Sequence, residues 1–244
     1  MKPVLAIEAY FDLICPWCLI GRRHLETAVH RFSRLHPEVE TAIDWRPHLL
    51  LPGTPADGLP YQAFYERRLG GPEAVAARRA QVQEAARPAA IEFAFDRIRM
   101  LPNTLAAHRL IGYAGRHGGV DRKEALIDAL FAAYFLDGEN IGDHGVLARI
   151  AAGRGFPENA VAAYLASGEG IRQFLEQQAA PGSSRVTGVP FYVFNDRLAL
   201  SGAHPPEALL EVMEQALPGS TSRAADDPLT DFRRRVPRGL AMKP

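Results

Sequence analysis

Residues 4–21 read VLAIEAYFDLICPWCLIG and contain the only two cysteines of the chain, Cys15 and Cys18. The first part, residues 4–11, has the length and partial alternation of a β-strand. After the cysteines, apolar residues recur at helical spacing, at positions 25, 28, 29 and 32. We therefore expect the CPWC sequence at a strand-to-helix junction, with Pro16 in the first helical turn, where its missing N–H costs little.

A cysteine at the start of a helix is favoured as a thiolate, because free backbone N–H groups and the helix dipole stabilise an anion there. The thiolate is the form that attacks disulfides. The sequence therefore predicts a lowered pKa and a sulfur open to water for Cys15. It predicts no such lowering for Cys18, which lies one turn deeper.

Two other uses of the cysteine pair are less favoured. A structural disulfide would close a loop of only two intervening residues and would restrict the unfolded chain very little. Structural zinc needs four ligands, and the chain has neither a second cysteine pair nor a suitably spaced histidine pair. His24 could approach Cys18 on a helix, but one histidine does not complete a site. We expect a redox dithiol and no metal.

In the rest of the chain the spacing of apolar residues changes from a strand pattern to a helical pattern and then back to a strand pattern. A second strand is expected over residues 39–47, then a Pro- and Gly-rich loop to about residue 60, then helices throughout residues 61–180. Helix starts are expected at Asn103 or Thr104, after Asp121, and at Asp143, Pro157 and Gly168, and the first of these helices runs towards Gly118. A hairpin follows over residues 191–201, and Pro205 and Pro206 open a last helix. The order is β-α-β, a helical block, then β-β-α.

This order and four segments resemble the DsbA-like branch of the thioredoxin superfamily, and most closely its FrnE-type group. The segments are YFDLICPWCLIG, NTLAAHRL, TGVPFYVFN and SGAHPPEALL. The group is related to 2-hydroxychromene-2-carboxylate isomerases and kappa-class glutathione transferases. The resemblance implies an α/β thioredoxin fold with a large all-helical insertion. We expect a discontinuous thioredoxin-like domain of residues 1–50 and 181–217, an insertion domain of residues 51–180, and a C-terminal tail of residues 218–244.

The resemblance also implies a thiol–disulfide oxidoreductase. Cys15 would form a mixed disulfide with the partner, and Cys18 would resolve it. The Val189–Pro190 peptide bond would be cis and face the dithiol, so that the backbone of Val189 could pair with an extended substrate. No cofactor is implied beyond the Cys15–Cys18 disulfide, with glutathione as a candidate co-substrate.

Three further residues are candidates for substrate binding: Pro16, Trp17 and Asn103. Each has an ordinary structural alternative. Trp17 either offers an apolar face to substrates or covers the helix end. Asn103 belongs to a segment that lies near the active site in relatives, and Asn is also a preferred helix cap.

Composition limits the partners. Lys and Arg (28) balance Asp and Glu (28), so the chain lacks the basic excess of a nucleic-acid binder. No apolar run is long enough to span a membrane, and no signal peptide is visible, so we expect a cytoplasmic protein. Disulfide-containing proteins or peptides are the expected substrates, and the chain is expected to be a monomer or homodimer. For the tail, disorder and docking through Leu229 and Phe232 are the alternatives.

Two other functions compete with this interpretation. A glutathione-dependent isomerase or transferase of the related branch would typically need a single reactive residue at the first motif position, and not the pair. A non-catalytic peptide-binding module would use the Val189–Pro190 region and would keep its activity without Cys15.

Overall fold

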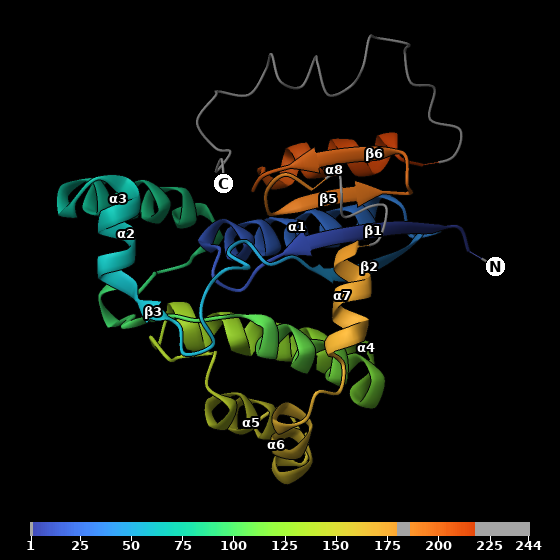
Figure 1. The fold of residues 1–244 in the computed structure, drawn as a ribbon. Coiled ribbons are helices and arrows are strands. Elements are labelled where there is room, and N and C mark those ends of the chain that lie inside the picture. Colours follow the sequence, from blue (N-terminus) through green and yellow to red (C-terminus); the bar gives the residue numbers. More distant parts are fainter. Residues whose placement is uncertain (1, 180–185, 218–244) are drawn as a thin grey trace. The chain divides into compact units, whose positions relative to one another are not determined.

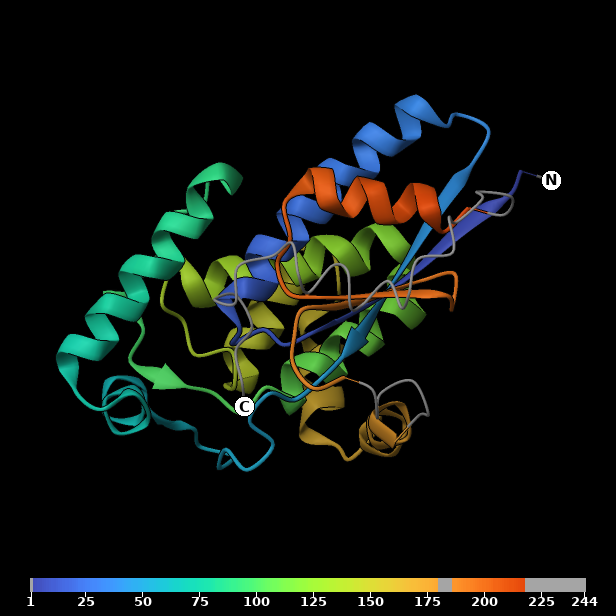
Figure 2. The ribbon, with the colours of Figure 1, turned by 90° about the horizontal axis from the view of Figure 1, so that it is seen from above.

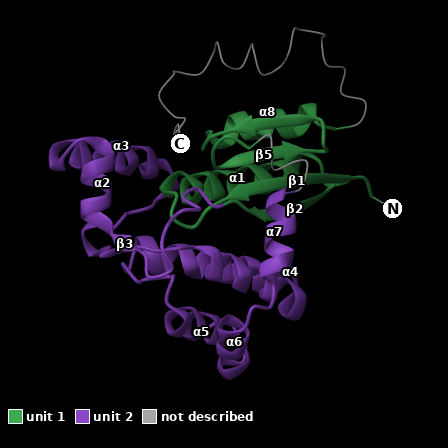
Figure 3. Ribbon diagram, in the orientation of Figure 1, with its two compact units in different colours: residues 1–48, 181–244 green, residues 49–180 purple. Residues whose placement is uncertain are grey.

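The computed structural model describes residues 2–179 and 186–217, and it divides the chain into two compact units. Residues 1–48 and 181–244 form unit 1, and residues 49–180 form unit 2 (Figure 3). The tail expected over residues 218–244 lies outside the described residues. Each unit is described by itself below.

Among its described residues, unit 1 contains a four-stranded mixed sheet and two helices (Figure 1). In chain order its elements are β1 (Val4–Phe11), α1 (Pro16–Leu35), β2 (Glu40–Pro47), β5 (Phe191–Phe194), β6 (Leu198–Ser201) and α8 (Pro206–Gln215). The strands lie in the order β2-β1-β5-β6. β1 pairs with β2 in parallel and with β5 antiparallel, and β5 and β6 form the expected hairpin. This is the predicted thioredoxin arrangement.

Helices α1 and α8 pack side by side in unit 1 (Figure 2). The apolar positions of α1 are buried towards the sheet, among them Leu25, Ala28 and Phe32, which the helical spacing had selected. Alternate residues of β1, such as Leu5 and Ile7, are also buried, as period 2 requires. The core of unit 1 is therefore the layer between the sheet and these helices.

Unit 2 is mainly helical. Its elements are β3 (Leu59–Pro60), α2 (Tyr61–Leu69), α3 (Pro72–Ala86), β4 (Met100–Leu101), α4 (Leu105–Phe135), α5 (His144–Ala152), α6 (Glu158–Ala166) and α7 (Ile171–Ala179), with 3-10 turns at Arg87–Ala89 and Phe95–Arg97. The helix expected from residue 103 towards Gly118 is present, and its axis breaks at Gly119, which has φ 74°. The predicted start at Asp143 is also confirmed, because its carboxylate accepts a hydrogen bond from the Val146 N–H at 2.9 Å.

The prediction that residues 61–180 are helical throughout is wrong for the stretch before α4. There β4 pairs antiparallel with β3, which lies just outside the predicted helical range, with Leu59 opposite Leu101. Proline at positions 88 and 102 prevents a continuous helix across this stretch. Strands of two residues are too short to produce a recognisable alternation, so the sequence pattern gave no sign of them.

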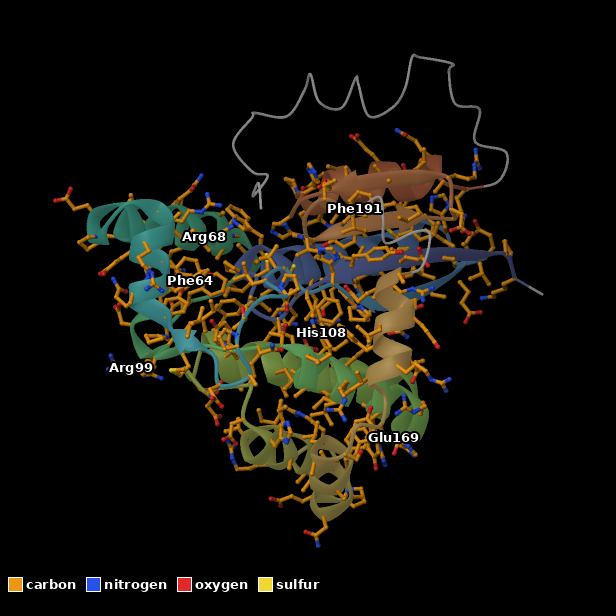
Figure 4. The ribbon with its side chains drawn as sticks, viewed as in Figure 1. Phe64, Arg68, Arg99, His108, Glu169 and Phe191 are labelled. Carbon is orange, nitrogen blue, oxygen red and sulfur yellow. The ribbon has the colours of Figure 1, made fainter. Side chains whose placement is uncertain are left out.

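Within unit 2, Arg109 on α4 binds the carboxyl-terminal end of α6 through hydrogen bonds. Its buried guanidinium donates hydrogen bonds to the carbonyl oxygens of Tyr164, Ser167 and Glu169, at 2.7–3.0 Å. Glu169 lies in the loop after α6 (Figure 4). The last carbonyl groups of a helix have no partner within the helix, so these contacts supply one.

Candidate active site

The CPWC sequence lies at the junction of β1 and α1, as predicted. Cys15 is the N-cap of α1 with an extended backbone (φ −93°, ψ 111°), and Pro16 begins the helix. The Cys15 N–H donates to the Asp12 carbonyl at 3.2 Å, and the Cys18 N–H donates to the Cys15 carbonyl at 3.0 Å. Proline suits this first position because its ring is compatible with the helix and an N–H there would have no intrahelical partner.

Both cysteines are free thiols, and the Cys15 sulfur faces the segment before β5. Its Sγ donates to the carbonyl oxygen of Val189 at 3.5 Å, across 174 positions of the sequence. The Val189–Pro190 peptide bond is cis. The structure therefore brings the dithiol and residues 188–190 together within unit 1.

The two thiols differ in their surroundings. The pKa of Cys18 is raised well above its ordinary value, first by burial, then by the hydrogen bond and charge of Cys15. A backbone hydrogen bond from Asp12 opposes this rise. The direction agrees with the prediction that Cys18 is not the activated thiol.

The prediction that the Cys15 sulfur is open to water is wrong. Cys15 has an exposed fraction of 0% and Cys18 of 1%. The helix N-terminus indicates where a thiolate is stabilised, but the exposure of the sulfur depends on what packs around the junction. Here the neighbouring Leu13 and Ile14 are also buried, and the Val189 carbonyl occupies one side of the sulfur.

A small residue lets the Pro190 ring approach α1. A Cβ atom at Gly21 would lie 2.9 Å from Pro190 Cγ and would overlap the Tyr192 hydroxyl. Gly21 follows Cys18 by three positions and so lies on the same helical face. On the other side, the Pro190 carbonyl accepts a hydrogen bond from the Gly202 N–H at 2.8 Å. The first turns of α1, Pro190 and the end of β6 are thus held as one cluster.

Most of the chain matches a model of a known protein family. Residues 6–214 match the model described as the DSBA-like thioredoxin domain. This chain belongs to that DsbA-like family. The match covers most of the chain, including most of β1, all of unit 2 and most of helix α8.

Solved structures of DsbA-like proteins have the same fold. A probable DsbA oxidoreductase from Streptomyces coelicolor is 26% identical, with a TM-score of 0.76, and the match covers 98% of this chain and all of that one. A 2-hydroxychromene-2-carboxylate isomerase is 16% identical with a TM-score of 0.62, over 86% of this chain and 95% of that one. The cytosolic disulfide reductase DsbM from Pseudomonas aeruginosa, determined with GSH, is 14% identical with a TM-score of 0.60. That match covers 86% of this chain and 98% of the DsbM chain. No curated protein matches the chain.

The other candidate residues of this DsbA-like chain have different surroundings. Pro16 is partly exposed. Trp17 is 2% exposed, so the structure does not give it an open apolar face, and its packing role is the one supported. The indole is buried together with the rest of the first part of α1, where residues 17–22 are all buried.

Asn103 belongs to unit 2, where both the oxygen and the nitrogen of its side-chain amide form hydrogen bonds. Its Oδ1 accepts from the Leu105 N–H at 3.0 Å, and its Nδ2 donates to the Thr54 carbonyl at 2.7 Å. The structure thus supports the helix-start role, although Thr104 is the N-cap residue itself. A substrate contact by Asn103 stays a prediction.

Three residues beside the dithiol were not identified as site residues: Gly21, Arg22 and Tyr192. Arg22 is buried, with its guanidinium 4.5 Å from the centre of the Trp45 ring and its Nε 3.2 Å from Glu26 Oε1. The spacing of Gly21 and Arg22 from Cys18, three and four positions, is the helical signal that could have found them. Tyr192 had no local signal, because it meets α1 only in the folded sheet.

Other classes of site are not supported by the described residues. Within residues 2–179 and 186–217, no three His, Cys, Asp or Glu side chains are grouped as metal ligands would be. None of the helices in these ranges is both long and apolar enough to cross a membrane.

Proposed function

We propose that this DsbA-like chain is a thiol–disulfide oxidoreductase that acts through Cys15 and Cys18 on protein or small-thiol disulfides. The observation that carries the proposal is the 3.5 Å separation of Cys15 Sγ and the Val189 carbonyl oxygen. A nucleophilic sulfur then adjoins a backbone edge that could pair with an extended substrate. Family membership and the likeness to the Streptomyces protein support the same reaction class.

The proposed reaction is a pair of exchanges. The Cys15 thiolate attacks one sulfur of the substrate disulfide, and the first substrate thiolate leaves and takes up a proton. The Cys18 sulfur then attacks Cys15 Sγ, which breaks the mixed disulfide and releases the second substrate thiol. The substrate gains two electrons and two protons, and the chain keeps a Cys15–Cys18 disulfide. No bound cofactor is needed, because the cysteine pair itself holds the electrons.

Burial of Cys15 adds a step before the first exchange. A sulfur that is 0% exposed must be uncovered locally before a substrate disulfide can line up with it. Exchange rates depend on access as well as on the thiolate fraction. Small, extended disulfides should therefore react faster than disulfides inside folded proteins.

We further propose that the net direction is reduction, with glutathione as the reductant of the Cys15–Cys18 disulfide. A reducing cytoplasm, the location proposed for this chain, keeps dithiols reduced. The structural relative DsbM is described as a cytosolic disulfide reductase and was determined with GSH.

The test is insulin reduction with glutathione as the electron source, followed by trapping. We expect activity in the wild-type chain, none in Cys15→Ser, and a persistent mixed disulfide in Cys18→Ser. Because the chain has only two cysteines, every adduct in a single variant is assigned without ambiguity. The double variant, which has no cysteine, is the control for non-covalent binding.

Other results would favour the competing functions. Isomerisation that depends on glutathione, with no insulin reduction and no trapped species, would favour the isomerase branch that the 2-hydroxychromene-2-carboxylate isomerase represents. Peptide binding that survives in the double variant, without any exchange, would favour a binding module. Either result would overturn the proposed oxidoreductase.

A further inference from the structure

Tyr192 has a buried hydroxyl group that the fold does not use. The residue is 1% exposed, and its hydroxyl has no hydrogen-bond partner in the described part of the chain. A buried polar group without a partner lowers the stability of the folded chain. Such groups are few in folded proteins, and each calls for an explanation, a catalytic role among them.

The hydroxyl lies against the helical face that carries Cys18. Tyr192 is on β5, opposite Ala9 of β1, and its hydroxyl would overlap a Cβ atom placed at Gly21. Gly21 and Cys18 are three positions apart and share one face of α1. The Pro190 ring approaches the same point. The unpartnered hydroxyl therefore meets α1 at Gly21, one helical turn after the resolving cysteine.

The raised pKa of Tyr192 is consistent with a hydroxyl that keeps its proton and can donate a hydrogen bond. The pKa of Tyr192 is raised well above its ordinary value, first by burial and then by charges on Cys18 and Cys15, while Arg22 opposes the rise. The phenol therefore stays neutral and keeps its proton. The pKa of Cys18 is also raised by burial, so a thiolate there lacks solvent stabilisation.

We propose that Tyr192 is a further catalytic residue, whose hydroxyl donates a hydrogen bond to the Cys18 sulfur as that sulfur becomes negatively charged. The proposal rests on the proposed function and concerns its second exchange. Cys18 Sγ forms the bond to Cys15 Sγ, the bond from Cys15 to the substrate sulfur breaks, and its electron pair leaves with the substrate. The Cys18 proton passes to that departing thiolate, and Tyr192 keeps its own.

The first test follows single turnovers of the reduced chain with glutathione disulfide as the probe. Tyr192→Phe removes only the hydroxyl. We expect the glutathione adduct of Cys15 to form at the wild-type rate and to be released more slowly, by roughly tenfold to a hundredfold, the effect of one hydrogen bond to a charged group. The adduct should therefore accumulate, as mass spectrometry of quenched samples would show. Release at the wild-type rate overturns the proposal.

Tyr10→Phe is the matched control. Tyr10 lies opposite Phe191, with their rings 6.2 Å apart, so both side chains are on the other face of the sheet from Tyr192. The Tyr10 hydroxyl donates to Glu8 at 3.1 Å. This variant should release the adduct at the wild-type rate, and equal slowing in both variants overturns the proposal.

A second measurement does not depend on enzyme activity. In a Cys15→Ser background, the ultraviolet absorbance of the Cys18 thiolate is followed against pH with Tyr or Phe at position 192. We expect the Tyr192→Phe change to raise the Cys18 midpoint by about one pH unit. An unchanged midpoint overturns the proposal, even where the proposed exchange activity has itself failed.

Stability separates this role from a structural one. Tyr192→Phe should unfold at the same urea concentration as the wild type or a higher one, because it deletes a polar atom that has no partner. A destabilised variant with unchanged adduct release and an unchanged Cys18 midpoint would show a packing role only and would overturn the proposal.

Discussion

The sulfur of Cys15 lies 3.5 Å from the carbonyl oxygen of Val189, although the two residues are 174 positions apart. The contact exists because β1 and β5 are neighbours in the sheet, which brings the end of β1 beside the start of β5. It places the reactive sulfur at a backbone edge. Both sulfurs of the dithiol are buried at this edge.

Alkylation by iodoacetamide at neutral pH should be at least about tenfold slower at Cys18 in the folded chain than in the chain unfolded in urea. Only the thiolate reacts, and burial both raises the pKa of Cys18 and blocks the reagent. Mass spectrometry of the peptides measures the labelling. Equal rates at Cys18 in the folded and unfolded chains would contradict the buried position of this sulfur.

Replacement of Gly21 by alanine should destabilise the chain by about 1–3 kcal/mol and lower its exchange activity. The added Cβ would lie 2.9 Å from Pro190 Cγ and would overlap the Tyr192 hydroxyl, so the cluster beside the dithiol must shift. Urea unfolding and insulin reduction are the measurements.

Gly112→Ala provides the control for the alanine substitution. Gly112 is also helical, and the nearest atom to its added Cβ is a flexible Arg116 nitrogen at 3.7 Å. That variant should gain about 0.5–1 kcal/mol from the better helix propensity of alanine. A similar gain in Gly21→Ala would show that α1 and Pro190 are not in close contact.

Stability should decrease in acid because of two buried histidines, His24 and His204. His24 Nδ1 lies 2.9 Å from the His204 carbonyl oxygen, and His204 Nε2 lies 2.8 Å from the Ser201 carbonyl oxygen. Burial lowers the pKa of both imidazoles, although the charge of Glu207 partly opposes this at His24. The folded chain then binds these protons more weakly than the unfolded chain does.

The stabilisation from these histidines should be complete above about pH 6.5, the ordinary histidine value, and should decline below it. The slope is at most about 1.4 kcal/mol per pH unit for each histidine. Urea midpoints between about pH 5 and pH 7.5 measure it. His24→Gln should flatten the slope, whereas His30→Gln, an exposed position on the same helix, should leave it unchanged. An unchanged slope in His24→Gln would contradict this assignment.

Much of the local structure could be predicted from the sequence because its causes are local. The strand over residues 4–11, the Asp143 cap and the 191–201 hairpin each depend on neighbouring residues and were found where expected. The break at Gly119 follows the same rule, since glycine tolerates positive φ. The pairing of β3 with β4 was missed because two-residue strands carry no periodic signal.

In the candidate site, too, some features had local causes that the sequence revealed, and others depended on the tertiary structure. The position of Cys15 at a helix start was readable from spacing, and the closeness of the dithiol to the Val189–Pro190 segment followed from the resemblance of whole segments. Its burial was predicted wrongly, because exposure depends on atoms contributed by distant parts of the chain. Tyr192 shows most clearly why a site residue was missed. In the sequence it is one residue of an ordinary strand pattern, and its hydroxyl meets α1 only after the sheet has formed.

By itself, the sequence determined the dithiol, its junction and the order of elements around it, because hydrophobic period, proline and capping residues act within a few positions. Tertiary structure alone decided which sulfur faces Val189, how deeply both sulfurs are buried, and that an unpartnered hydroxyl adjoins the face of Cys18. Desolvation and packing are sums over atoms close in space, and most of those atoms are distant in the chain.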